Sequence, residues 1–161
     1  MFKVSFKDKP KDPSKAIIRK GNITTVILKG VVSLPSFFYD MPQIILQWVS
    51  DQTKVELYDN MANNTLIIYS TGEARCHDED VFDPILGERL AEARVKYYIY
   101  KFFYDLTSKL SDYYIGLLFG DAGVAGSGKG SCLTQDMKKY EALCIRESHH
   151  IGELLKAKEN G

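Results

Sequence analysis

The chain has 161 residues, of which 45% are hydrophobic and 26% charged, so we expect a single globular domain over residues 1–161. This composition excludes a disordered chain, and three cysteines, an odd number, do not suit a disulfide scaffold. The 21 basic residues balance 21 acidic ones, which argues against a uniformly basic nucleic-acid-binding protein. No run is long and apolar enough for a membrane span or a signal peptide, so we expect a cytoplasmic protein without a membrane partner.

Two β-branched runs near the N-terminus predict a β-hairpin. They cover residues 16–20 and 23–28 and flank Gly21-Asn22. Both of these turn residues adopt positive φ easily, as a tight hairpin turn requires.

Residues 30–71 are predicted to be a β-rich insertion. Its first part, residues 30–42, is broken by glycine and proline and is predicted to be a loop. Alternating or β-branched runs predict three strands, at residues 43–49, 53–58 and 65–69. Residues 70–73 then predict a turn into a short strand over 74–76.

The second half of the chain predicts helices. Asp83 followed by proline is typical of a helix start, because aspartate caps the first amide groups and proline suits the first helical position. A long helix is predicted over about 83–110 and a C-terminal helix over about 134–158, separated by a flexible glycine-rich loop at 120–131. The expected fold class is therefore α+β, with an antiparallel sheet packed against these helices.

A glycine-rich segment at 123–130 matches the phosphate-binding loop of nucleotide hydrolases at both glycines and at Lys129. It has Gly130 where that motif needs a serine or threonine to hold magnesium. Such a loop also needs a parallel sheet around it, whereas only one helix is predicted to follow. We therefore favour a flexible linker, keep Lys129 as a candidate anion-binding residue, and expect no cofactor.

The segment 76–83 holds a thiol, an imidazole and several carboxylates, and its candidate metal ligands are His77, Asp78 and Asp80. Its spacing matches no tetrahedral zinc pattern. Negative charge is favourable at a helix N-terminus, so the helix start at Asp83 also explains these acids. We favour the structural interpretation, and a metal site is the alternative.

The first 31 residues carry eight lysines or arginines against two aspartates, and Arg19, Lys20 and Lys29 lie near the hairpin. These cations can bind phosphates, or they can protect an edge strand from aggregation. Residues 73–92 are acidic, so the charge is bipolar along the chain, which suits docking onto a charged protein surface. Aromatic residues complete the candidate binding residues: Phe37, Phe38, Tyr39, Tyr113 and Tyr114.

Two segments resemble short bacteriophage- and prophage-encoded proteins that carry no assigned activity. One is the hairpin at 17–28; the other, 72–83, reads G-x-A-x-C and then D-x-F-D at the start of a helix. Asp78 stands where that group has proline, and residues 29–71 intervene where it has a short turn. The resemblance implies a sheet-plus-helix core and a mobile-element origin. The chain also has a weak similarity to double-stranded-RNA-binding domains, which pack three strands on a long helix.

We therefore expect a non-enzymatic accessory protein of phage or mobile-element origin that binds a host protein or ribonucleoprotein complex in the host cytoplasm. A counter-defence inhibitor of the anti-CRISPR kind is the example we favour. One alternative is an accessory protein that binds nucleic acid through the basic hairpin. Another is a small nucleotide- or metal-binding enzyme. Whether the chain forms a homodimer is left open.

Overall fold

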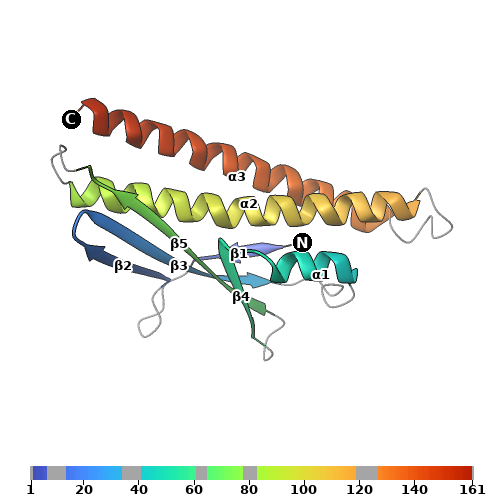
Figure 1. Cartoon of the computed structure of the whole chain (residues 1–161). Coiled ribbons are helices and arrows are strands. Elements are labelled where there is room, and N and C mark those ends of the chain that lie inside the picture. Colours follow the sequence, from blue (N-terminus) through green and yellow to red (C-terminus); the bar gives the residue numbers. More distant parts are fainter. Residues whose placement is uncertain are drawn as a thin grey trace.

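The computed structural model describes residues 2–6, 14–33, 41–60, 65–77, 83–118 and 127–160. In this part of the chain the fold is α+β, as the sequence predicts (Figure 1). The elements follow in the order β1 (Lys3–Ser5), β2 (Lys15–Lys20), β3 (Ile23–Ser33), α1 (Gln43–Ser50), β4 (Val55–Asn60), β5 (Thr65–Arg75), α2 (Pro84–Leu118) and α3 (Ser127–Asn160).

One antiparallel sheet is built around two long strands, β3 and β5. They pair over their whole length, from Ile23 opposite Arg75 to Ser33 opposite Thr65. Strand β4 pairs with the outer edge of β5, but only over Thr65–Ser70. The second half of β5 therefore has no strand on its outer side among the described residues.

The outer edge of β3 is shared by two strands that lie end to end. Strand β2 pairs with Ile23–Leu28 and β1 with Val31–Ser33. The turn between β2 and β3 contains Gly21 with a φ of 60°, the left-handed conformation that the Gly21-Asn22 pair predicts. The predicted hairpin is confirmed.

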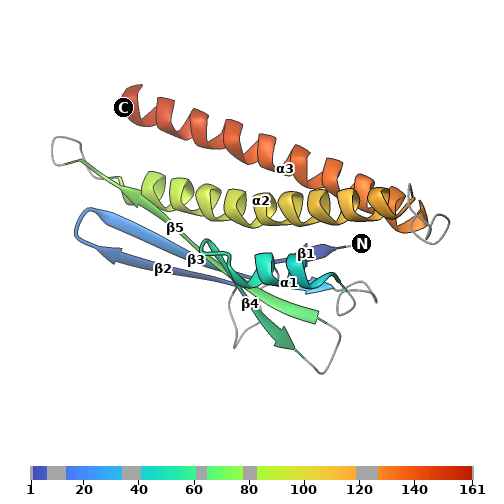
Figure 2. The same cartoon turned by 45° about the vertical axis from the view of Figure 1, so that its right-hand side comes forward.

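The three layers of the molecule are the sheet, α2 and α3. Helix α2 lies across β3 and β5, and α3 packs along α2 on the side away from the sheet (Figures 1 and 2). Alternate residues of each strand face α2, as the period of two along a strand requires. Besides Gly30 and Gly72, those of β3 and β5 that are buried are Thr24, Val26, Leu28, Val32, Leu66, Ile68, Ser70 and Ala74.

Gly72 in β5 lets the backbones of β5 and α2 come into direct contact. A Cβ atom at this position would clash with the carbonyl oxygen of Ala91 and lie 2.8 Å from the backbone nitrogen of Val95. The glycine is needed for this close approach, since any side chain would push the helix away from the sheet. Residues 70–73 are accordingly part of one continuous strand, and the predicted turn there is wrong.

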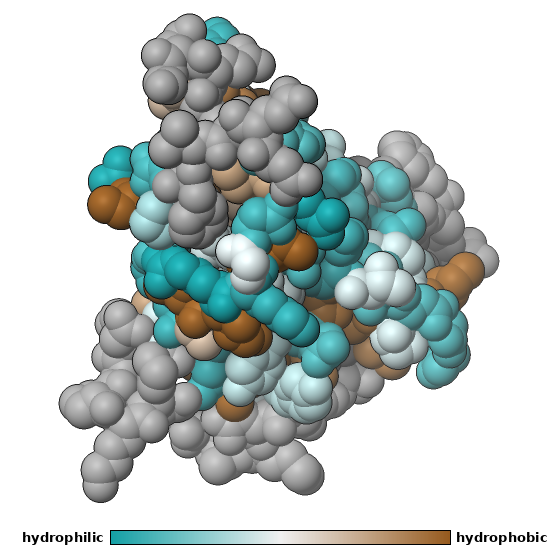
Figure 3. Space-filling view, turned by 60° about the vertical axis from the view of Figure 1, so that its left-hand side comes forward, coloured by the Kyte–Doolittle hydropathy of each residue, from teal (hydrophilic) through white to brown (hydrophobic). Residues whose placement is uncertain are grey.

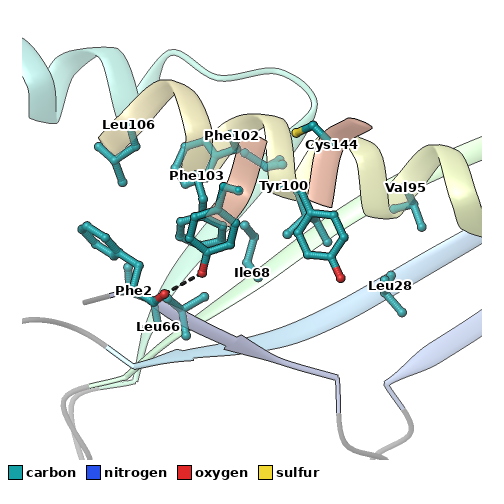
Figure 4. Close-up of a cluster of buried hydrophobic side chains, with 14 of the residues drawn as sticks. Phe2, Leu28, Leu66, Ile68, Val95, Tyr100, Phe102, Phe103, Leu106 and Cys144 are labelled. Atoms are coloured by element: carbon teal, nitrogen blue, oxygen red, sulfur yellow. Dashed lines mark hydrogen bonds between the residues drawn. The ribbon is translucent and has the colours of Figure 1, made fainter. Parts of the chain in front are cut away.

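Aromatic side chains join the N-terminal residues to the helices (Figure 4). The ring of Phe2 lies 6.0 Å from that of Phe103 in α2, and Phe103 stacks at 5.1 Å on Tyr140 of α3. The Tyr140 hydroxyl donates a hydrogen bond to the Phe2 carbonyl oxygen at 2.5 Å. The Phe2 amide donates to the Asp136 carboxylate at 2.7 Å, so α3 holds both backbone groups of this residue.

Residues 43–49, predicted as a strand, form helix α1 instead. An apolar run of this length does not distinguish helix from strand by its periodicity. The helix is favoured because Trp48 stacks on Phe102 at 5.6 Å and Ile45 is buried. The segment 30–71 therefore contains a helix as well as strands.

The two long helices exceed their predicted bounds. Helix α2 continues to Leu118, and α3 already begins at Ser127, so residues 127–131 of the predicted loop at 120–131 are helical. Residues 120–126 lie outside the described residues. No helix in the described part of the chain is long and apolar enough to cross a membrane.

Candidate functional site

The face of the sheet that points away from α2 is not covered by any helix among the described residues; we call it the open face (Figure 2). Cross-strand pairing places Val31, Ile67 and Tyr58 in one row on this face. Val31 is 38% and Tyr58 is 52% exposed, and Ile67 is half-buried. The row is thus an apolar band that runs across three strands and is accessible to solvent.

The neighbouring rows extend this band. Next to it, Lys29, Tyr69 and Glu56 lie opposite one another, and the rings of Tyr69 and Tyr58 meet edge to face at 5.6 Å. Ile27 follows in the next row, and Ile18 of β2 is 52% exposed on the same face. The open face therefore carries more large apolar side chains than is usual for a sheet face that is exposed only to solvent.

Charges surround the apolar band unevenly. The cations of the open face are Lys3, Lys20, Lys29 and Arg75, and its acids are Glu56 and Glu73. The Tyr58 hydroxyl donates to the Glu56 carboxylate at 2.8 Å, and this hydrogen bond raises the pKa of Tyr58. The end of the molecule with the β2–β3 hairpin is mostly hydrophilic, with small separate hydrophobic areas (Figure 3).

A groove of about 900 Å³ adjoins the open face where β4 stops pairing with β5. On its α2 side, the Arg94 guanidinium donates to the Glu73 carbonyl oxygen at 2.7 Å, and the Lys54 ammonium lies 5.1 Å from the centre of the Tyr98 ring. The full lining comprises Ile27, Thr53, Lys54, Glu56, Tyr58, Ile67, Tyr69, Ser70, Thr71, Glu73, Arg94 and Tyr98.

The basic hairpin does not form the single patch that its sequence suggests. Arg19 lies on the α2 side, where its guanidinium is 3.1 Å from the Glu88 carboxylate. Lys20 and Lys29 lie on the open face, in different rows. Lys15 likewise pairs with Glu88 at 3.3 Å and with Glu92 at 3.1 Å. The basic and acidic segments of the sequence are therefore neighbours in space, and part of the charge bipolarity is neutralised within the molecule.

The predicted aromatic sites are also separated. Tyr114 is only 6% exposed and belongs to the core, whereas its neighbour Tyr113 is 40% exposed. Phe37, Phe38 and Tyr39 lie outside the described residues. Lys129 lies in the first turn of α3.

The segment predicted either to start a helix or to bind a metal does start a helix. The Asp83 carboxylate accepts hydrogen bonds from the amides of Ile85 at 3.0 Å and Leu86 at 3.2 Å, as a capping residue does. His77 is exposed, and Asp78 and Asp80 lie outside the described residues. Within the described residues, no three His, Cys, Asp or Glu side chains are grouped to hold a metal ion.

Apart from Lys20 and Lys29, the residues of the open face and its groove were not among the candidates predicted from the sequence. Ile67, Tyr69 and Glu73 alternate with Leu66, Ile68 and other covered residues, so the period-two pattern was a usable signal. The pattern was not recognised over the whole strand, because a turn predicted at Gly72 divides it into two parts. Comparison with protein-family models, with curated proteins and with solved structures gives no match for this chain.

Proposed function

We propose that this chain is a non-catalytic binding protein that docks another protein onto the open face of its sheet. The observation that carries the proposal is the exposed apolar row of Val31, Ile67 and Tyr58. The core lies on the other face of the sheet, so the fold does not depend on these side chains being buried. Exposed apolar side chains that gather on one surface are typical of protein-interaction sites.

The charges around the row indicate which kind of surface the partner has. Lys3 and Lys29 lie in the two rows on either side of it, and Lys20 lies farther along the open face, opposite Ile23. A complementary surface has an apolar centre and acidic residues facing these lysines. An aromatic residue that is partly exposed before binding, such as Tyr58, suits the centre of such an interface.

The class of partner follows from the resemblance of two segments to bacteriophage- and prophage-encoded proteins. On this basis we propose a host protein or ribonucleoprotein complex in the host cytoplasm, which the chain inhibits as a counter-defence protein. The neutralisation of Lys15 and Arg19 by Glu88 and Glu92 makes the hairpin less able to bind phosphates. It therefore favours this proposal over direct nucleic-acid binding.

The test is affinity capture from bacterial lysate, with and without nuclease, using the intact tagged chain. Two variants, Val31→Asp and Tyr58→Asp, place a charge in the apolar row. The matched control is Ile145→Asp, which changes a residue of α3 that is 51% exposed and distant from the sheet. We expect the unmodified chain to recover a stoichiometric, nuclease-resistant partner. Both row variants should recover at least about tenfold less of this partner, and the control variant should recover as much as the unmodified chain.

Two outcomes would contradict the proposal. Recovery that depends on nucleic acid, together with submicromolar, length-dependent affinity for bare DNA or RNA in an anisotropy titration, would favour the nucleic-acid alternative. A partner that all three variants bind equally well would show that another surface does the binding.

A further inference from the structure

We propose that the open face receives an amphipathic helix of the partner protein, which lies diagonally across the sheet from β4 to β2. This inference rests on the proposed function and deepens it, because it states which structure of the partner meets the apolar row. It also assigns contacts to two residues outside that row, Ile27 and Ile18. The two proposals can therefore be tested separately.

Four apolar side chains of the open face lie on one diagonal of the sheet. Starting from Tyr58 in β4, each step to the next strand and the next row of the same face meets Tyr69, then Ile27 and then Ile18. The ring centres of Tyr58 and Tyr69 are 5.6 Å apart, so neighbours on this diagonal are close enough to touch. Both of its ends are accessible, since Tyr58 and Ile18 are each 52% exposed. We call these four residues the apolar diagonal.

The length of the apolar diagonal corresponds to a helix of ordinary size. Neighbouring strands lie about 4.8 Å apart and two residues along a strand span about 6.6 Å, so the three steps cover about 25 Å. A helix rises about 1.5 Å per residue and would need about 16 residues to cover this distance. Val31 and Ile67 lie beside the first step and widen the apolar surface at the β4 end.

A helix fits this arrangement better than a second sheet. A sheet packed face to face would cover the whole open face, including the carboxylates of Glu56 and Glu73, and burying a charge is costly unless it is paired. An amphipathic helix covers a stripe and leaves its flanks in water. Helix α2 already covers the other face of β3 and β5, so a second helix would complete a helix–sheet–helix arrangement.

The charges beside the apolar diagonal define the flanks of this helix. On the flank towards the groove lie two exposed carboxylates, those of Glu56 and Glu73. The cations of the open face lie on the opposite flank, Lys3 and Lys29, or one row beyond Ile18, Lys20 and Arg75. Of these cations, Lys29 and Arg75 already interact within the chain. The partner helix should therefore carry basic residues on the flank that faces Glu56 and Glu73.

The experiment uses a fluorescein-labelled helical peptide of about 18 residues, titrated with the whole chain in an anisotropy assay. Leucines spaced by three and four residues form its apolar stripe, and lysines occupy one flank. One control peptide has the same composition in an order that removes the stripe. A second control has glutamates in place of the lysines. We expect saturable binding of the lysine peptide and at least about tenfold weaker binding of both controls.

Substitutions in the chain locate the bound peptide. Ile18→Asp changes the end of the apolar diagonal that is farthest from the apolar row and should weaken binding at least about tenfold, whereas Ile145→Asp on α3 should not. If Ile18→Asp does not fold, Ile18→Thr serves in its place.

A charge reversal tests the flank. The Tyr58 hydroxyl already donates to Glu56, so the substitution is made at Glu73. Glu73→Lys should lower the ratio of the affinities for the lysine and glutamate peptides at least about tenfold. Glu141→Lys, the same charge reversal on the exposed surface of α3, should leave this ratio unchanged.

Three results would overturn the inference. The first is no saturable binding of the lysine peptide up to about 1 mM, and the second is binding that the substitution at Ile18 leaves unchanged. The third is a dimer of the chain alone, detected by sedimentation, that dissociates when Ile18 is substituted. A second copy of the chain would then occupy the apolar diagonal.

The failure of this inference is distinguishable from that of the proposed function. If the peptide does not bind but partner capture still depends on Val31 and Tyr58, the open face docks a protein and only the helix is wrong. If the peptide binds along the apolar diagonal while capture is insensitive to Val31 and Tyr58, the proposed function is wrong.

Discussion

Ile67 and Ile68 are neighbours in β5, yet they lie in different environments. Ile68 is fully buried under α2, whereas Ile67 is half-buried on the open face and lines the groove. Val32 and Val31 of β3 differ in the same way, 1% against 38% exposed. In each of these pairs the two residues are of the same type. The apolar side chains of one face therefore build the core, whereas those of the other face remain accessible to solvent.

The largest expected effect comes from separating α2 from the covered face. Gly72→Ala places a methyl group against the backbone of α2, which cannot move aside as a flexible side chain would. We expect a loss of about 4 kcal/mol or more in the free energy of unfolding, measured by chemical denaturation. The control is Gly152→Ala in helix α3, because a Cβ atom at that position has no neighbouring atom within 4 Å. It should stabilise the protein slightly, by up to about 1 kcal/mol. Equal effects of the two substitutions would refute the close contact at Gly72.

Truncating the neighbouring isoleucines compares the two faces directly. Ile68→Ala should cost about 2–5 kcal/mol in the free energy of unfolding, because it leaves a cavity beneath α2. Ile67→Ala should cost about 1 kcal/mol or less, because that side chain is already partly in water. Partner capture should show the reverse order, weakened by Ile67→Ala and retained by the folded Ile68→Ala protein. Equal losses in the free energy of unfolding would show that Ile67 is covered as completely as Ile68.

The start of α2 gives a smaller effect. Asp83→Ala removes the acceptor for the amides of Ile85 and Leu86 and should cost about 1 kcal/mol. The control is Asp112→Ala, which changes an exposed aspartate in the interior of the same helix and should be neutral or slightly stabilising. Thermal unfolding monitored by circular dichroism measures both. A neutral Asp83 variant would mean that the cap contributes nothing to holding α2 in place.

The ion pairs between the hairpin and α2 give the smallest effect, and it depends on pH. Burial of the Glu92 carboxyl opposes its ionisation, but hydrogen bonds from Lys15 and Lys96 outweigh this and lower the pKa of Glu92. The hydrogen bond to Glu92 in turn raises the pKa of Lys15. A carboxyl with a lowered pKa stabilises the fold above the ordinary glutamate value of about 4.3. That contribution is lost as the pH falls through the folded-state pKa.

Glu92→Gln should therefore cost about 0.5–1 kcal/mol at neutral pH and nothing once the pH is below the folded-state pKa of Glu92. Denaturation at both pH values measures this difference. Glu153→Gln, at an exposed position of α3, is the control and should have no effect at either pH. A cost that is the same in acid would assign the effect of Glu92→Gln to packing rather than to charge.

Features that depend on neighbouring residues were predictable from the sequence. The β2–β3 turn follows from the positive φ that Gly21 adopts, and the start of α2 follows from the capping carboxylate of Asp83. The α+β class and the two long helices follow from the change of periodicity after residue 76. In each case the interactions that determine the structure lie within a few residues of one another.

Features that depend on distant residues were not predictable. Residues 43–49 form a helix because Ile45 is buried and Trp48 stacks on Phe102 of α2, which lies far along the chain. A glycine such as Gly72 usually indicates a turn. Its close contact with a helix backbone can be inferred only when the position of α2 is known.

The sequence by itself determined which residues of β3 and β5 share a face, because side chains alternate along any strand. Only the tertiary structure decided which face is covered, since this depends on the packing of α2 against the sheet. It also decided that Arg19 meets Glu88, so that two oppositely charged segments partly neutralise each other. The open face exists because both long helices lie on the same side of the sheet, which is a long-range property that no local pattern encodes.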